Sequence, residues 1–313
     1  RFVRTKGYLK EKKAGKMMRD NPQVSYSAAY ASSFLNKRRN FSNRGIMYFG
    51  KLCLALWDGG LPWKMDPKTL DTYFQDDFKG YLQDLPNMAS RVRIDSLNNR
   101  LIIFGYDGDT KVSVKEFNDQ LQCGRIREEK ISNGPTLITD FAITERFYVF
   151  SVPSISFDKL GYSLGIKAMD QAFFQRTDES STFVLVPRSN KGKTDPIVVP
   201  ADPHVCWEMA NAYDDGNKVV IDYIRSDPLR TSKALAEAGA RPGLSQELNF
   251  SYEEHVLPKK LVRCTISLED NEVTEDIISD KHCDFAIIES NKSSLPHKHV
   301  FLAIGGNEGK SPS

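Results

Sequence analysis

Two of the five histidines in this 313-residue chain, His297 and His299, are spaced so that both could reach one metal ion. They lie two residues apart in a segment that we expect to be a strand, where such side chains point to the same side. Neutral imidazole is the most common metal ligand in proteins. A histidine pair in a turn or at the surface is the default alternative, and the spacing alone leaves both interpretations open.

Other catalytic patterns are absent from the sequence. No GxSxG motif supports a serine nucleophile, and no GxGxxG or Walker-type glycine loop is present. The glycine-rich segment FLAIGGNEGK (301–310) lacks a following helix, so it predicts a strand and a turn. The acidic residues form no paired-carboxylate pattern. The residues alone therefore indicate no hydrolytic or nucleotide chemistry.

Composition and cysteine usage are those of an ordinary globular protein. A net charge of +2 gives no nucleic-acid footprint, and no run of 18 apolar residues predicts a membrane-spanning helix. The five cysteines, Cys53, Cys123, Cys206, Cys264 and Cys283, lie far apart without CxxC spacing. Cys53 and Cys206 fall in apolar segments, which favours buried thiols and a reducing compartment.

Short β-type segments separated by turn signals recur along the chain, and β-branched and aromatic residues dominate them. The expected strand regions are 45–58, 99–108, 140–154, 181–189, 195–202, 217–227, 259–270, 282–290 and 297–306. Only the segments near 68–83 and 231–239 predict short helices. This rhythm predicts an all-β fold, and it leaves a sandwich, a barrel and a propeller open.

Five blocks, in the same order, resemble motifs of the carotenoid cleavage dioxygenase family, which includes the retinal pigment epithelial membrane proteins. They are RFVRTKGYLKEKKAGK (1–16), LALWDGGLPWKMDPKTLDT (54–72), RVRIDSLNNRLIIFGYD (91–107), DFAITERFYVF (140–150) and WEMANAYDDG (207–216). The resemblance implies a seven-bladed β-propeller of carotenoid oxygenase type with a helix and loop cap. It implies one propeller domain over 1–313. Because family members are longer, we expect that propeller to be partial and incomplete at both ends.

The resemblance also indicates which residues stand where the family binds iron. Active members hold Fe(II) with four neutral imidazoles, and carboxylates orient three of the rings. At three of the ligand positions this chain has Arg91, Thr139 and Glu208. A guanidinium offers no lone pair, a hydroxyl is a poor ligand, and one carboxylate does not replace four imidazoles. We therefore expect no metal and no catalytic residue, with Fe2+ as the alternative.

A sharper hypothesis concerns Arg91 itself. Asp58 occupies the position where the family has a glutamate that orients a metal-binding histidine. If the geometry of the propeller axis is kept, Arg91 could lie where the iron would be, paired with Glu208 and Asp58, so that one fixed positive charge replaces another. The alternative is that Arg91 faces solvent in a collapsed site.

Two further sets of residues could carry function by resemblance. Trp57, Trp63 and Trp207 lie in or beside the central motifs and could line a tunnel for a long conjugated ligand, although core packing is the more common use of tryptophan in a strand. The loop 157–180 resembles the family's apolar membrane-facing region through Leu160, Leu164, Ile166, Met169, Phe173 and Phe174. An exposed set of this kind marks a membrane or protein contact, and a buried cap helix is the alternative.

The function expected from these observations is that of a catalytically inactive member of the family. It would act as a carotenoid-binding or structural subunit of a larger complex at a photosynthetic membrane, with protein partners and no nucleic acid. The alternative is an active non-haem Fe(II) dioxygenase that cleaves carotenoid or apocarotenoid double bonds. By analogy with carotenoid chemistry in phototrophs, the expected location is a plastid, peripheral to a membrane, with the cytoplasm as the alternative.

Overall fold

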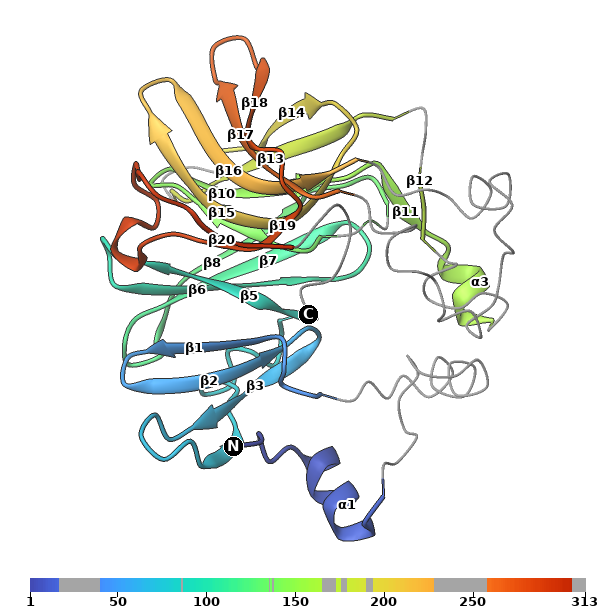
Figure 1. Cartoon of the computed structure of the whole chain (residues 1–313), viewed down its shortest axis with the longest axis vertical. Coiled ribbons are helices and arrows are strands. Elements are labelled where there is room, and N and C mark those ends of the chain that lie inside the picture. Colours follow the sequence, from blue (N-terminus) through green and yellow to red (C-terminus); the bar gives the residue numbers. More distant parts are fainter. Residues whose placement is uncertain are drawn as a thin grey trace. The chain divides into compact units, whose positions relative to one another are not determined.

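The computed structural model describes residues 1–16, 40–85, 87–134, 136, 138–164, 173–175, 179–189, 194–227 and 258–305 (Figure 1). The chain divides into two compact units. Unit 1 comprises Arg1–Val92, Asn99–Lys130 and Asp158–Phe173, and unit 2 comprises Arg93–Asn98, Ile131–Phe157 and Phe174–Ser313. The expectation of one domain over the whole chain stays a prediction. The loop 231–251 and the helix expected at 231–239 lie outside the described residues.

The expected all-β architecture is confirmed. Two four-stranded sheets lie in the first part of the chain: β1 (Gly45–Phe49), β2 (Leu52–Trp57), β3 (Gly60–Met65) and β4 (Thr72–Gln75), then β5 (Met88–Asp95), β6 (Arg100–Tyr106), β7 (Lys111–Phe117) and β8 (Cys123–Lys130). Strands that are neighbours in the sequence are neighbours in each sheet. Such back-and-forth sheets are typical of propeller blades.

Two more four-stranded sheets follow: β9 (Phe141–Ile143), β10 (Phe147–Val152), β13 (Ser181–Pro187) and β14 (Ile197–Ala201), then β15 (Val205–Asp215), β16 (Lys218–Ser226), β17 (Lys260–Ser267) and β18 (Val273–Ser279). The pairs β11 (Ile155–Phe157) with β12 (Phe173–Gln175), and β19 (Cys283–Ile287) with β20 (Phe301–Ile304), form two-stranded sheets. The helical elements are short: α1 (Lys6–Ala14), α3 (Lys159–Ser163) and the 3-10 turn η1 (Ser290–Lys292). The same blade-like pattern thus recurs along the chain (Figure 1).

The prediction of a short helix near 68–83 is wrong. Asp66 accepts hydrogen bonds from the backbone N–H groups of Lys68 and Thr69, which forms a turn, and β4 follows. Leu70 and Phe78 have positive φ angles of 59° and 51°, and an α-helix cannot pass through that conformation. Short polar turns therefore replace the expected helix.

Helix α1 was not expected from the sequence. Thr5 caps its N-terminus by accepting a hydrogen bond from Tyr8 N at 3.2 Å, and Gly15 ends it with φ +62°. None of its residues is buried. Local capping, rather than an apolar face, thus specifies this helix.

Each unit has its own apolar core. In unit 1 the rings of Phe78 and Phe117 meet edge to face at 5.1 Å, and both side chains are fully buried. In unit 2 the inner faces of two sheets bury a continuous cluster that includes Val149, Phe183 and Tyr223. These cores fix the strands that carry the candidate site residues.

Candidate functional site

The three positions where the family would place metal-binding histidines all fall at the first strand of a four-stranded sheet. Arg91 lies within β5 and is half-buried, Thr139 lies two residues before β9, and Glu208 lies within β15. The register of β15 against β16 shifts between Cys206 and Glu208, as at a β-bulge. Such an irregularity re-aims the side chains that follow it.

Thr139 uses its hydroxyl within the protein. Its Oγ1 donates a hydrogen bond to the backbone carbonyl oxygen of Cys206 at 2.5 Å. Burial is the largest cause that raises the pKa of the Cys206 thiol well above its usual range. In this structure Cys206 is therefore a buried, protonated thiol beside Thr139.

Glu208 is a buried carboxylate with a structural contact. The residue is only 7% exposed, and its Oε2 accepts a hydrogen bond from the backbone N–H of Ala286 at 3.1 Å. This bond ties β15 to β19 within unit 2. The backbone of β19 therefore holds this carboxylate.

An ion pair that sequence reasoning missed links three segments of unit 2. Arg93 Nη2 lies 2.8 Å from Asp140 Oδ2 and also donates to the carbonyl oxygen of Met209 at 2.7 Å, while Nε donates to the carbonyl oxygen of Phe141 at 2.7 Å. The Asp140 side chain is 1% exposed and accepts a further bond from Met209 N at 2.8 Å. One guanidinium and one carboxylate thus join the start of β9 and the middle of β15 to the end of β5. The sequence held a signal for this ion pair, because Arg93 and Asp140 lie within two residues of Arg91 and Thr139.

Asp58 has partners of its own in unit 1. Its Oδ1 accepts from Ser90 N at 2.7 Å, and its Oδ2 lies 3.2 Å from Arg44 Nε. Arg44 is thus an identified cationic partner of Asp58. The expected pairing of Arg91 with Glu208 joins residues of different units and stays a prediction.

Comparison with known proteins decides the family. A family model described as retinal pigment epithelial membrane protein matches residues 1–312. The chain belongs to this family.

Curated members of the family match at low identity. The apocarotenoid-15,15'-oxygenase of Synechocystis sp. is 26% identical over the whole of this chain and 63% of its own length. Carotenoid cleavage oxygenase 1 of Neurospora crassa is 24% identical over 97% of this chain and 56% of its own length. The chain therefore spans less than two thirds of the length of these relatives.

Solved structures confirm the fold. A mutant of the Synechocystis oxygenase superposes with a TM-score of 0.82 at 24% identity, covering 98% of this chain and 64% of that chain. The cobalt-substituted form of the same oxygenase gives a TM-score of 0.81 over the same shares. The β-propeller of carotenoid oxygenase type, expected from the resemblance, is thus the fold of this chain.

The residues that the resemblance places at iron-ligand positions do not fit an iron site of four imidazoles. Arg91 carries a permanent positive charge, Thr139 donates its hydroxyl hydrogen to a carbonyl, and Glu208 is one carboxylate. Across the part of the chain that the structure describes, no group of three or more His, Cys, Asp or Glu side chains is arranged to hold a metal ion.

The histidine pair of the C-terminal region is not arranged as expected. His297 is buried, with Nε2 2.9 Å from Asp222 Oδ2 and Nδ1 3.0 Å from Asn211 Nδ2, whereas His299 is exposed near Glu289. The strand begins only at Phe301, so the alternation that would place both on one side does not apply. The two histidines thus lie outside any strand, on either side of a bend at Lys298, with a buried side chain at His297 and an exposed one at His299.

His204, four residues before Glu208, is also a structural histidine. Its Nδ1 lies 2.8 Å from the carbonyl oxygen of Asp202, and its Nε2 lies 2.9 Å from Ser151 Oγ. Burial is the largest cause that lowers the pKa of its imidazole. Because Nδ1 donates to the carbonyl, Nε2 accepts from the serine hydroxyl, and both nitrogens of the neutral ring are used.

The three tryptophans have different surroundings. Trp63 packs in a core cluster with Cys53 and Met65 and is 7% exposed. Trp57 is half-buried and meets Phe41 edge to face, and Trp207 donates from Nε1 to Ser226 Oγ at 2.7 Å. Trp63 therefore packs in the core, which was the alternative to a tunnel. A ligand tunnel lined by all three tryptophans stays a prediction.

The apolar set of the loop 157–180 is only partly described. Leu160 is 71% exposed and Leu164 is 55% exposed at α3. Ile166 and Met169 lie outside the described residues, and Phe173 and Phe174 begin β12. These two leucines are therefore not buried, as the alternative of a cap helix packed against the propeller would require. No described helix is long and apolar enough to cross a membrane.

Proposed function

We propose that this chain is a catalytically inactive member of its family that acts as a carotenoid-binding or structural subunit of a larger complex. The observation that carries the proposal is the hydrogen bond from Thr139 to the Cys206 carbonyl. It supports the proposal because the hydroxyl serves the fold at a position where the family resemblance implies an imidazole ligand.

The neighbouring ion pair supports the same proposal. The ion pair between Arg93 and Asp140, with the hydrogen bond from Arg93 to the Met209 carbonyl, links β5, β9 and β15. The fold at this point is thus held without any need for a metal ion.

The proposed location is a plastid, peripheral to a photosynthetic membrane. Exposed Leu160 and Leu164 support a peripheral contact with lipid or with a partner protein, because apolar side chains gain free energy when they leave water. Flotation of the protein with liposomes tests this part. Binding that persists in Leu160→Ser/Leu164→Ser would contradict it.

The second candidate is an active dioxygenase. Relatives named as carotenoid and apocarotenoid oxygenases match over nearly the whole chain, and buried Glu208 is a group that can bind a metal. Incubation with β-carotene and an apocarotenal, together with organic extraction of the isolated protein, separates the candidates. The proposal predicts intact substrate, and an extract containing carotenoid identifies the binding role.

A further inference from the structure

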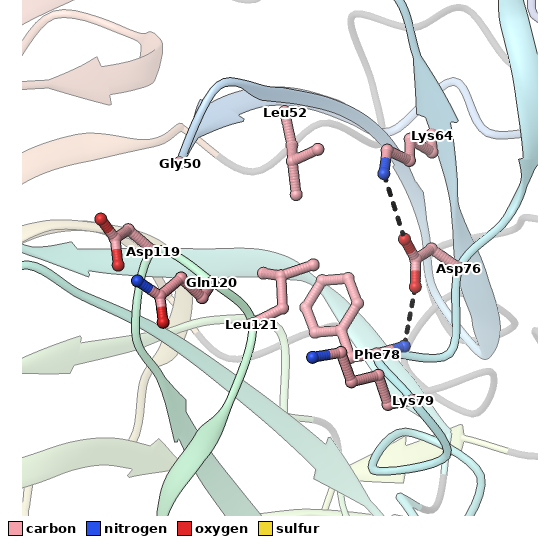
Figure 2. A pocket seen from close by; sticks show the side chains of 9 residues that line it. All are labelled: Gly50, Leu52, Lys64, Asp76, Phe78, Lys79, Asp119, Gln120 and Leu121. Carbon is pink, nitrogen blue, oxygen red and sulfur yellow. Dashed lines mark hydrogen bonds and ion pairs between the residues drawn. The ribbon is translucent and has the colours of Figure 1, made fainter.

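A pocket of about 300 Å³ lies in unit 1, and Arg91, Thr139, Glu208 and Asp58 are not among its lining residues (Figure 2). This volume is at the lower end of the range for small-molecule sites. Lys64 and Asp76 stand together at one side, Asp119 and Gln120 at another, and Leu52 faces Leu121 between them. The pocket therefore has polar residues at two sides and apolar side chains between them.

Lys64 and Asp76 face each other without forming a hydrogen bond. Lys64 Nζ is 4.0 Å from Asp76 Oδ2, and the two side chains are 27% and 14% exposed. Asp76 Oδ1 accepts from Phe78 N at 2.9 Å, and the Lys64 ammonium lies 5.6 Å from the centre of the Phe74 ring. Within the described residues, neither Lys64 Nζ nor Asp76 Oδ2 has a hydrogen-bond partner.

The 4.0 Å separation fits one bridging oxygen. A hydroxyl oxygen placed off the line between the two atoms can lie about 2.8 Å from each. It would accept from the ammonium and donate to the carboxylate, and a hydroxyl is the simplest group that does both. A carboxylate ligand would be repelled by Asp76, and an ammonium ligand by Lys64.

The rest of the lining sets the character of the ligand. Leu52, Leu121 and Phe78 supply apolar surface, and Lys79 and Asp119 add one charge of each sign. Together with Lys64 and Asp76, the ionisable groups sum to zero, so the pocket favours an uncharged molecule.

The walls are held in shape by the backbone. Phe78 and Lys79 both have positive φ angles, 51° and 59°, which are uncommon for residues other than glycine. At the opposite wall, a Cβ on Gly50 would lie 2.3 Å from the carbonyl oxygen of Asp119, so only glycine permits this approach.

We propose that this pocket binds a small uncharged molecule with one hydroxyl group on an apolar body, of the class of simple phenols. The hydroxyl lies between Lys64 and Asp76, and the apolar body lies between Leu52 and Leu121. The site does not depend on the presence or loss of iron chemistry in the propeller.

The test compares para-ethylphenol with para-ethylanisole, in which a methyl ether removes the hydroxyl hydrogen. Saturation-transfer NMR detects contact with the full chain, and calorimetric titration measures affinity. We expect para-ethylphenol to bind saturably and at least about tenfold more tightly than the ether, because a hydrogen bond to a charged group is lost. Equal affinity of the two probes, or saturable binding of neither, overturns the proposal.

Variants locate the binding. Lys64→Met keeps the length of the side chain without its charge, and Leu52→Trp fills the space between the apolar walls. Each is expected to weaken para-ethylphenol binding about tenfold or more. The exposed Lys111→Met, outside the lining, is the matched control and should stay within about twofold. Wild-type affinity in both pocket variants would place the probe elsewhere and overturn the proposal.

Discussion

Arg93 is the residue whose role differs most from what its position suggested. The sequence drew attention to Arg91, because a family motif places a histidine there, whereas Arg93 makes the ion pair with Asp140 and bonds to two backbone carbonyls in unit 2. A motif identifies which position has changed, but it does not identify which nearby arginine forms the ion pair. That choice depends on contacts between segments more than 40 residues apart.

Removing one member of this pair should destabilise the protein strongly. Arg93→Met leaves the Asp140 carboxylate buried without its cation, and we expect the free energy of unfolding to fall by about 3 kcal/mol. Arg93→Met/Asp140→Asn removes both charges and should lose less than the sum of the two single changes. Urea denaturation of the four proteins measures this coupling. Additive losses would show that the two charges do not interact.

Arg91→Met is the companion variant for the Arg91 hypothesis. If Arg91 is buried with carboxylate partners, its loss should also lower the unfolding free energy, by more than its loss together with Glu208→Gln. Unchanged melting of Arg91→Met would end that hypothesis and leave the Arg93 result untouched.

His204 should make stability depend on pH. Burial lowers its pKa below the ordinary 6.5, so the unfolded chain takes up a proton near that pH while the folded chain does not. Stability is therefore highest above pH 6.5 and falls as the pH decreases below it. His204→Gln should show a flatter profile of unfolding free energy between pH 7.5 and about 5. An unchanged slope in the variant would assign the pH dependence to other groups.

Strands were the elements best predicted from the sequence. Regions such as 99–108 and 181–189 correspond to single strands because alternation and β-branched residues carry the signal locally. The region 45–58 is instead a hairpin, since Gly50 and Lys51 have φ angles of 55° and 66° and reverse the chain in two residues. Strands with a charged exposed face, such as β8 with its alternating burial, were not expected at all.

The β1–β2 turn gives a prediction about glycine. Gly50→Ala should cost about 1 kcal/mol for the left-handed conformation, and more for the clash with the Asp119 carbonyl. Gly216→Ala is the matched control, because Gly216 has a similar φ of 59° with no atom within 4 Å of the added Cβ. Thermal melting should show the larger loss for Gly50→Ala. Equal losses would mean that the close approach to Asp119 carries no cost.

For the molecule as a whole, the resemblance predicted the fold and the family, and both are confirmed. A superposition covering 98% of the chain at 24% identity shows how far the propeller persists while its sequence diverges. Fold depends on many interchangeable apolar contacts, whereas iron binding depends on a few side chains of the right type at fixed positions. This is why the architecture could be inferred from scattered motifs, and the chemistry had to be examined position by position.

The most direct test of the account is the iron content of the purified full-length protein, measured by plasma mass spectrometry after incubation with Fe(II) under anaerobic conditions. The account predicts far less than one iron per chain and no apocarotenal from β-carotene. One iron per chain, together with formation of apocarotenal, would contradict it.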